Sequence, residues 1–196
     1  MTRKGKGKGK RKGKKRNQAI EKRPRWLELP EVIWVDILQR LGAVGMMLTA
    51  EKVCTTWRRL CKDPSMWRVI NMNNCCDTYL VSYFKAQEMC RRAVDRSQGE
   101  LVDINMEYFA TDELLAYVAE RSGKLKRLGI ACCYDMVHKD LVEAVQKFPL
   151  LEELSLTHTT ITTKGIEAIR RSCPRLKSFD VNNNSCFMCL VWYSDY

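Results

Sequence analysis

Apolar residues with the spacing of an α-helix begin shortly after Trp26 and continue to Leu41. Pro30 and Glu31 suit the first turn of such a helix, because proline has no N–H to leave unpaired and a carboxylate favours the positive end of the helix dipole. Gly42 is expected to end the helix. The apolar stripe consists of Ile33, Trp34, Ile37, Leu38 and Leu41, with Val32 and Val35 beside it. A helix that is apolar over so much of its circumference has to pack on more than one side.

A second helix is predicted over residues 49–61, where apolar residues again fall at helical intervals. Those positions are Ala50, Val53, Cys54, Trp57 and Leu60 or Cys61. Basic residues lie at its C-terminal end, as the helix dipole favours. Asp63 and Pro64 indicate a turn, and residues 66–70 then form either a short helix or the start of a strand.

The following part of the chain contains one pattern, Leu-x-x-apolar-x-apolar, four times. The four occurrences are Leu101/Ile104/Met106, Leu125/Leu128/Ile130, Leu151/Leu154/Leu156 and Leu176/Phe179/Val181. Their first leucines are 24 to 26 residues apart, and a glycine or proline stands two residues before each. Helices are predicted between these strands, with inner faces formed by Leu115/Val118/Ala119, Leu141/Ala144/Val145/Phe148 and Ile166/Ile169/Cys173. One more helix is predicted over residues 80–97.

Repeats of this length, each with one strand and one helix, predict a solenoid. A single unit cannot bury its own apolar face, so neighbouring units stack and their strands form a parallel sheet lined by helices. The leucines then face the core, while residues between them, such as Glu153 and Ser155, point outward. The expected fold class is α+β, with a three-helix N-terminal module over residues 26–70 and a short α/β solenoid of about three to four units over residues 71–182.

Positive charge is concentrated in the first 25 residues of the chain. This segment contains 13 Lys/Arg and one acid, a formal charge of +12, whereas the whole chain carries +11. Like charges repel, and alternating Lys and Gly bury no apolar surface, so residues 1–25 are predicted to be a disordered basic tail. The densest part of the tail is a candidate nuclear localisation signal formed by Lys10, Arg11, Lys12, Lys14, Lys15 and Arg16.

The basic tail leaves one alternative open, a nuclear repeat protein that associates with nucleic acid. Aromatic residues that could stack on bases are missing from the sequence before Trp26, so specific nucleic-acid recognition is not expected. The sequence shows neither a secretory signal nor an apolar run of membrane-spanning length. We therefore expect location in the nucleus or cytoplasm, with the ten cysteines reduced.

Residues 26–70 resemble the F-box motif in the order and spacing of their residues. The matching positions are Leu29-Pro30-Glu31, Ile33, Ile37-Leu38, Leu41, Val53-Cys54, Trp57-Arg58-Arg59-Leu60, Asp63-Pro64, Trp67 and Ile70. Together with the repeats, residues 26–182 resemble plant F-box/leucine-rich-repeat proteins of the SKP-interacting-partner type. Residues 93–99 and 150–156 also carry this resemblance.

The resemblance implies a non-catalytic substrate-recognition subunit of an SCF (Skp–cullin–F-box) ubiquitin ligase. The F-box would dock on a Skp-type adaptor, which connects to cullin and RING subunits, and the repeats would bind a target protein. The implied adaptor-binding residues are Leu29, Pro30, Ile33, Ile37, Leu38, Leu41, Val53, Cys54, Trp57 and Trp67. Some of them are expected to form the core of the module instead, with Trp57 the first candidate for the core and Leu29-Pro30 for the contact.

Enzymatic and metal-dependent functions find little support in the sequence. The two histidines, His138 and His158, lie in no nucleophile or metal motif, and no glycine-rich phosphate loop follows a predicted strand. Cys186 and Cys189 have the spacing of a zinc-ligand pair, but a structural zinc site needs a second pair. No catalytic residue, metal or cofactor is predicted.

Two features depart from the F-box and repeat patterns. Gly45 stands where many F-box proteins carry an acidic residue, and glycine costs a helix about 1 kcal/mol relative to alanine. After Val181 the sequence has three asparagines, a serine and the apolar run 186–193, without a polar cap for the last repeat. We expect residues 183–196 to be an atypical apolar tail, which indicates truncation, altered splicing or a partner that covers it.

Overall fold

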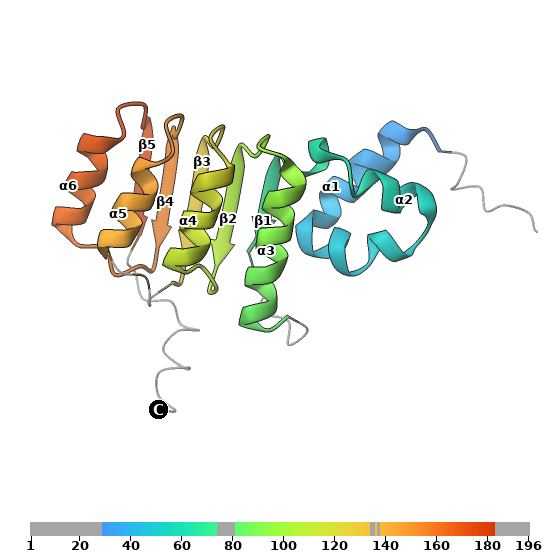
Figure 1. Ribbon diagram of the computed structural model, residues 1–196, viewed down its shortest axis with the longest axis horizontal. Coiled ribbons are helices and arrows are strands. Elements are labelled where there is room, and N and C mark those ends of the chain that lie inside the picture. The colour runs from blue at the N-terminus through green and yellow to red at the C-terminus, as the bar shows by residue number, and fades with distance from the viewer. Residues whose placement is uncertain (1–28, 74–80, 134–135, 137, 183–196) are drawn as a thin grey trace, which may run out of the picture. The chain divides into compact units, whose positions relative to one another are not determined.

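The computed structural model describes residues 29–73, 81–133, 136 and 138–182 of the chain. The chain divides into two compact units, Met1–Pro30 and Glu31–Tyr196. The second unit contains a helical N-terminal region and a five-stranded parallel sheet with accompanying helices (Figure 1).

Helix α1 spans Glu31–Leu48 and changes direction at Gly42. Gly42 has φ 68° and ψ 177°, a backbone conformation that is essentially restricted to glycine. The predicted end of the first helical stretch at Gly42 is therefore confirmed, although a further helical stretch follows without a loop. Four side chains of α1 are buried in the core: Trp34, Leu38, Ala43 and Met46.

The single helix predicted over residues 49–61 is wrong, because two shorter helices form there. The 3-10 helix η2 covers Ala50–Lys52, and the α-helix α2 covers Thr55–Leu60. Cys54 lies between them in an extended conformation, and its sulfur accepts a hydrogen bond from the backbone N–H of Trp57 at 3.5 Å. A residue that caps a helix in this way has to leave the helical conformation, so Cys54 separates the two helices.

The turn predicted at Asp63 and Pro64 is present. The Asp63 carboxylate accepts a hydrogen bond from the backbone N–H of Ser65 at 2.9 Å and caps the 3-10 helix η3, Pro64–Trp67. Strand β1, Val69–Met72, follows directly. Residues 66–70 thus include both the end of a short helix and the start of a strand. The expected boundary between the N-terminal module and the solenoid, at residues 70/71, falls inside β1.

The part of the chain after residue 80 alternates between helices and strands. Its elements are α3 (Tyr83–Ser97), β2 (Asp103–Glu107), α4 (Asp112–Arg121), β3 (Arg127–Ala131), α5 (His138–Gln146), β4 (Glu153–Thr157), α6 (Thr163–Ser172) and β5 (Ser178–Asn182). All four strands predicted from the leucine pattern are confirmed, as are the helices between them. Strand β1 adds a fifth strand that this pattern did not identify.

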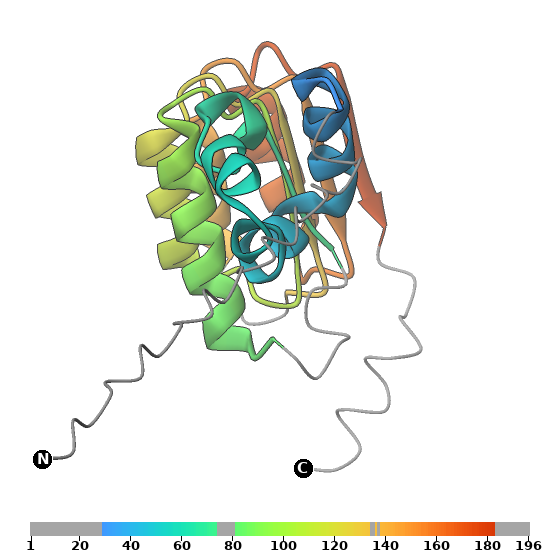
Figure 2. The same ribbon diagram turned by 90° about the vertical axis from the view of Figure 1, so that its right-hand side faces the viewer.

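The five strands are parallel and lie in the order of the sequence, β1-β2-β3-β4-β5. Helices α3 to α6 all lie on one side of the sheet (Figure 2). The register aligns apolar residues of neighbouring strands, so that Ile104 pairs with Leu128 and Leu128 with Leu154. These side chains are buried under the helices, and the alternate residues of each strand face the other side of the sheet.

One apolar core continues from the N-terminal helices into the sheet. Strand β1 pairs with β2 through the register of Ile70 with Ile104 and Met72 with Met106, and all four side chains are buried. The N-terminal region therefore supplies the first strand of the sheet, and the two regions fold against each other.

Candidate functional site

Exposed apolar side chains are concentrated in the N-terminal region. Seven large apolar residues are exposed in the described part of the chain, and six of them belong to residues 29–73. These six are Leu29, Val32, Ile33, Leu41, Val53 and Val69, and their exposed fractions range from 40% to 70%. Isolated exposed apolar residues are ordinary, but a concentration of them indicates a surface that binds a partner.

Helix α1 places three of the predicted adaptor-binding residues on one face. Ile33, Ile37 and Leu41 are four residues apart, and the helix is regular up to Gly42, so their side chains follow one another along its surface. Ile33 and Leu41 are exposed, whereas Ile37 is half-buried and packs against the core. This row is the candidate adaptor-binding row.

The ten predicted adaptor-binding residues fall into three groups by exposure. Those that are exposed are Leu29, Pro30, Ile33, Leu41 and Val53. Those that are half-buried are Ile37, Cys54 and Trp57. Leu38 and Trp67 are fully buried, with exposed fractions of 0%, and have no surface left for a partner in this structure. Their role is to hold the helices together.

Of the two tryptophans in the predicted adaptor-binding set, Trp67 and not Trp57 is enclosed by the core. The indole N–H of Trp67 donates to the backbone carbonyl of Cys61 at 2.9 Å, which satisfies its polar group inside the core. Trp57 is half-buried, and its ring meets that of Trp34 edge-on at a centroid distance of 5.6 Å. The choice of Trp57 as first candidate for the core therefore needs correction, because Trp57 packs at the margin of the core.

Val32 is an exposed residue that was absent from the predicted set. Its exposed fraction of 70% is the largest among the apolar residues of α1. The sequence contains a signal for it, since Val32 is an apolar residue that lies outside the helical stripe and before Ile33. An apolar residue off the buried stripe of a surface helix is available to a partner.

An ion pair fixes the start of α1 against α2. Arg59 Nη2 lies 2.6 Å from Glu31 Oε2, and a second hydrogen bond joins the same two side chains. The hydrogen bond from Arg59 lowers the pKa of Glu31, and the same interaction raises the pKa of Arg59. Both groups stay charged at neutral pH, and the pair orients the first turn of α1, which carries Val32 and Ile33.

A second ion pair joins the N-terminal region to the first helix after it. Glu51 in η2 accepts a hydrogen bond from Arg96 in α3, and only 19% of each side chain is exposed. The Arg96 guanidinium also lies over the Trp67 ring, 5.1 Å from its centre. We call Glu51, Arg96 and Trp67 the junction cluster, because together they connect η2, η3 and α3.

Two buried cysteines, Cys61 and Cys90, have raised pKa values. Burial raises the pKa of Cys61 to about 11, with a smaller contribution from Glu51, and burial raises the pKa of Cys90 to about 12. Both therefore remain protonated thiols at neutral pH. Cys54, Cys132, Cys133 and Cys173 are the other described cysteines, and all are free thiols. Cys186 and Cys189 lie outside the described residues.

The side of the sheet opposite the helices is lined by three rows of mainly polar residues, which we call the open face. The register places Val69, Asp103, Arg127, Glu153 and Ser178 in the first row. The second row contains Asn71, Asn105, Gly129, Ser155 and Asp180. The third contains Glu107, Ala131, Thr157 and Asn182. None of these residues is buried, so the open face is accessible along all five strands.

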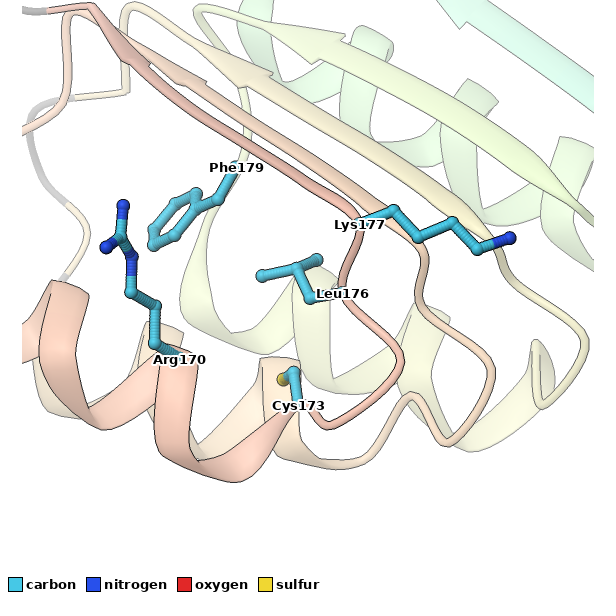
Figure 3. Close-up of a pocket in the computed structure, with 5 residues that line it drawn as sticks. All are labelled: Arg170, Cys173, Leu176, Lys177 and Phe179. Carbon is cyan, nitrogen blue, oxygen red and sulfur yellow. The ribbon is translucent and has the colours of Figure 1, made fainter.

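A hollow of about 240 Å³ lies between α6 and β5, beside the start of the last described strand (Figure 3). Leu176, Phe179 and Cys173 line it, and the Arg170 guanidinium lies 6.0 Å from the centre of the Phe179 ring. Lys177 points away from these residues, and its ammonium group lies 2.5 Å from a Glu152 oxygen. The hollow is therefore lined by both apolar and charged side chains.

Other residues singled out in the sequence form no catalytic or metal arrangement in the described part of the chain. No group of three or more possible metal ligands occurs there. His158 follows β4 with φ 51°, and its backbone N–H donates to the Asn182 carbonyl at 2.7 Å, which is a structural role. His138 is the first residue of α5. No helix among the described residues is long and apolar enough to cross a membrane. The basic cluster from Lys10 to Arg16 lies outside the described residues.

Comparison with known families assigns this architecture to a class of proteins. Residues 26–73 match the F-box-like family, and residues 86–195 match the family described as FBD-associated F-box protein At5g56370, LRR repeats. The chain therefore belongs to the plant F-box/leucine-rich-repeat proteins, as the sequence resemblance indicated. The match of the second family covers more than half of the chain and includes α3 to β5.

Curated proteins of Arabidopsis thaliana are similar to this chain over most of its length. F-box protein SKIP19 is 44% identical over 159 residues, which are 81% of this chain and 52% of that protein. F-box/LRR-repeat protein 23 is 43% identical over 157 residues, 80% of this chain and 35% of that protein. F-box/LRR-repeat protein 9 is 40% identical over 164 residues, 80% of this chain and 65% of that protein. The chain thus spans between about a third and two thirds of the length of these relatives.

Proposed function

We propose that this chain is a substrate-recognition subunit of an SCF ubiquitin ligase. Its F-box region docks on a Skp-type adaptor, which brings in cullin and RING subunits, and its strand–helix units are leucine-rich repeats of a short solenoid that bind the target protein. The chain performs no catalytic step itself. The observation that carries this proposal is the exposed apolar surface of α1 within the F-box-like region.

The exposed apolar side chains of the F-box region give a physical reason for docking. Val32, Ile33 and Leu41 keep between 43% and 70% of their surface in contact with water. Complete burial of an aliphatic side chain contributes about 1.5–3 kcal/mol, so burying the remaining surface of several such residues favours a stable complex. The ion pair between Glu31 and Arg59 joins the first turn of α1 to α2 beside these residues.

The junction cluster supports the second half of the proposal. A receptor subunit has to hold its target in a defined position relative to the adaptor. Strand β1 continues from the F-box region into the sheet, and the Glu51–Arg96 pair joins the same two regions a second time. A half-buried ion pair combined with a cation–π contact resists bending at this point.

Co-purification with a Skp-type adaptor tests the proposal directly. The full chain and the adaptor should elute together as a 1:1 complex in size-exclusion chromatography at micromolar concentration. The double variant Ile33→Asp/Leu41→Asp should abolish co-elution, because it introduces charge into the candidate adaptor-binding row. Phe84→Asp is the matched control, since Phe84 is 81% exposed but lies on α3 outside the F-box region.

Two outcomes would contradict the proposal. If the wild-type chain and the adaptor elute separately, the docking function is wrong. If Phe84→Asp abolishes co-elution as strongly as the α1 variant does, the contact lies elsewhere or the loss is not specific. Circular dichroism of all variants establishes that they are folded.

We also propose that the basic cluster formed by Lys10, Arg11, Lys12, Lys14, Lys15 and Arg16 directs the protein to the nucleus. Its charge density supports this proposal. Residues 1–16 fused to a large fluorescent reporter should concentrate it in the nucleus, and substitution of the six basic residues by glutamine should abolish this. A diffuse distribution of the wild-type fusion would contradict it.

A further inference from the structure

The open face of the sheet has an excess of negative charge. Asp103, Glu107, Glu153 and Asp180 contribute four carboxylates, and Arg127 contributes the one cation among the three rows. The open face therefore carries a formal charge of −3 at neutral pH. Charged residues of α3 to α6 are not part of this formal charge, because these helices lie on the opposite side of the sheet (Figure 2).

The single cation of the open face is already neutralised. Arg127 Nε donates to Asp103 Oδ2 at 2.8 Å across the first row, and this hydrogen bond raises the pKa of Arg127. Asp103 also accepts a hydrogen bond from the side-chain amide of Asn105 at 3.1 Å, so its oxygens have protein partners. The remaining charge belongs to Glu107, Glu153 and Asp180.

Two of these carboxylates are available to a partner. Glu153 on β4 and Asp180 on β5 are both exposed, and neither forms an ion pair within the described part of the chain. The lysines nearest to the strand starts are engaged elsewhere, since Lys126 and Lys177 both pair with Glu152 at 3.3 and 2.5 Å. Arg127 lies beside Glu153 across the first row and attracts it, but the same guanidinium is bonded to Asp103, so the carboxylates of the open face still outnumber its single cation.

The spacing of the carboxylates defines the kind of ligand. Glu107 on β2 and Asp180 on β5 are three strand spacings apart, which is at least about 14 Å. Among the described residues, no three possible metal ligands come close enough together to hold one metal ion. A nucleic-acid backbone would be repelled by the same charges. An extended peptide with several basic residues can reach across this distance, because each residue adds about 3.3 Å.

The middle of the open face carries mainly short side chains. Gly129 has no side chain, and the side-chain oxygen of Asn105 occupies the space where a Cβ of residue 129 would lie, at 2.0 Å. Ala131 and Ser155 beside it are short. This part of the open face therefore presents the methyl group of Ala131, the hydroxyl group of Ser155 and the amide group of Asn105.

We propose that the open face binds an extended, lysine- or arginine-containing segment of the target protein, with Glu153 and Asp180 contacting its cations. The inference rests on the proposed function, in which these units hold the target. Charge complementarity at exposed pairs governs which partners bind and makes the affinity dependent on salt.

Peptide binding by the full chain tests the inference. The probe is a fluorescein-labelled dodecapeptide of alternating lysine and serine, measured by fluorescence anisotropy at about 50 mM salt. A dodecapeptide of alternating glutamate and serine reports binding to the basic tail, which is identical in every variant. The test variant is Glu153→Lys/Asp180→Lys, and Glu153→Gln/Asp180→Asn removes the charges without reversing them.

The matched control is Glu88→Lys/Glu113→Lys, which changes the net charge by the same amount as the reversal. Glu88 on α3 and Glu113 on α4 are both exposed, and both lie on the helical side of the sheet. The open-face reversal should weaken binding of the lysine peptide by about tenfold or more, whereas the control should change it by less than about twofold. The glutamine/asparagine variant should weaken it by a smaller factor.

Equal losses in the open-face and control variants would overturn the inference, because they would show a response to net charge alone. Unchanged binding by the open-face reversal would overturn it as well. Adaptor co-elution is measured on the same proteins. Loss of co-elution with intact peptide binding would refute the proposed docking function and not the open face, whereas intact co-elution without peptide binding would refute the open face alone.

Discussion

The F-box region and the strand–helix units present opposite kinds of surface. Residues 29–73 expose six large apolar side chains, whereas the described residues from 81 to 182 expose one, Phe84. The open face is instead mainly polar, with an excess of carboxylates. The same chain therefore has one surface with exposed apolar area, which burial would stabilise, and another with an excess of negative charge.

The difference fits the proposed function, in which the F-box region binds an adaptor and the strand–helix units bind a target. An adaptor common to many receptors is suited to an apolar surface, whose attraction is non-directional and needs no exact pairing of side chains. A target has to be distinguished from other proteins, and distinction relies on charges and hydrogen-bonding groups that a wrong partner leaves unpaired.

The largest effect should come from truncating a buried rather than an exposed leucine of α1. Leu38 is fully buried and Leu41 is 45% exposed, although they lie three residues apart on the same helix. Leu38→Ala should lower the free energy of unfolding by about 2–5 kcal/mol, because it leaves a cavity. Leu41→Ala should lower it by less than about 1 kcal/mol but should weaken adaptor binding. Urea denaturation and adaptor titration measure the two effects. Equal losses of stability would show that α1 packs differently.

The second effect tests the change of direction in α1. Gly42→Ala should destabilise the protein by about 1–3 kcal/mol, because alanine at φ 68° is strained even though no atom lies within 4 Å of the added Cβ. Gly123→Ala is the control, since its Cβ also meets nothing within 4 Å and its φ is not positive. That variant should change stability by less than about 0.5 kcal/mol. Thermal unfolding of both variants measures the difference. A Gly42→Ala variant as stable as the wild type would contradict the prediction of strain at residue 42.

The third effect compares the junction cluster with a surface ion pair. Arg96→Gln should cost about 1–3 kcal/mol, because it leaves the largely covered Glu51 carboxylate without its partner and removes the contact with Trp67. Arg171→Gln, which breaks the exposed pair with Glu167 on α6, should cost about 0.5 kcal/mol or less. A double-mutant cycle with Glu51→Gln isolates the coupling. A coupling energy of zero between Arg96 and Glu51 would show that this ion pair does not help to hold the two regions together.

The smallest effect should appear on acidification. Hydrogen bonds from Lys177 and then Lys126 lower the pKa of Glu152 below its ordinary value of 4.5, and Lys124 does the same for Glu100. These pairs link neighbouring units and contribute stability that is present above about pH 4.5 and disappears as pH falls through the lowered pKa values. Glu152→Gln should therefore reduce the melting temperature slightly at pH 7 and leave it unchanged at pH 2. An equal decrease at both pH values would show that charge is not the cause.

Much of the fold could be predicted because burial is periodic. The pattern Leu-x-x-apolar-x-apolar, as in Leu125, Leu128 and Ile130, identified β2 to β5. It did so because alternate residues of each strand enter the core. Gly42 marked the end of the first helical stretch because few residues other than glycine adopt its conformation. The F-box resemblance was equally local, as it depended on the order of residues from Leu29 to Ile70.

The tertiary structure decided which members of each apolar pattern are covered. Leu38 and Leu41 belong to the same stripe, and only the position of the neighbouring elements makes one a core residue and the other part of a surface. The burial of Trp67 has the same cause, because Trp67 is covered by Arg96 from a helix far along the chain and donates a hydrogen bond to Cys61. The open face also required the strand register, since Glu107, Glu153 and Asp180 are far apart in sequence and only parallel pairing places them on one side of the sheet. A sequence pattern records which residues avoid water, whereas which of them remain exposed to a partner depends on long-range packing.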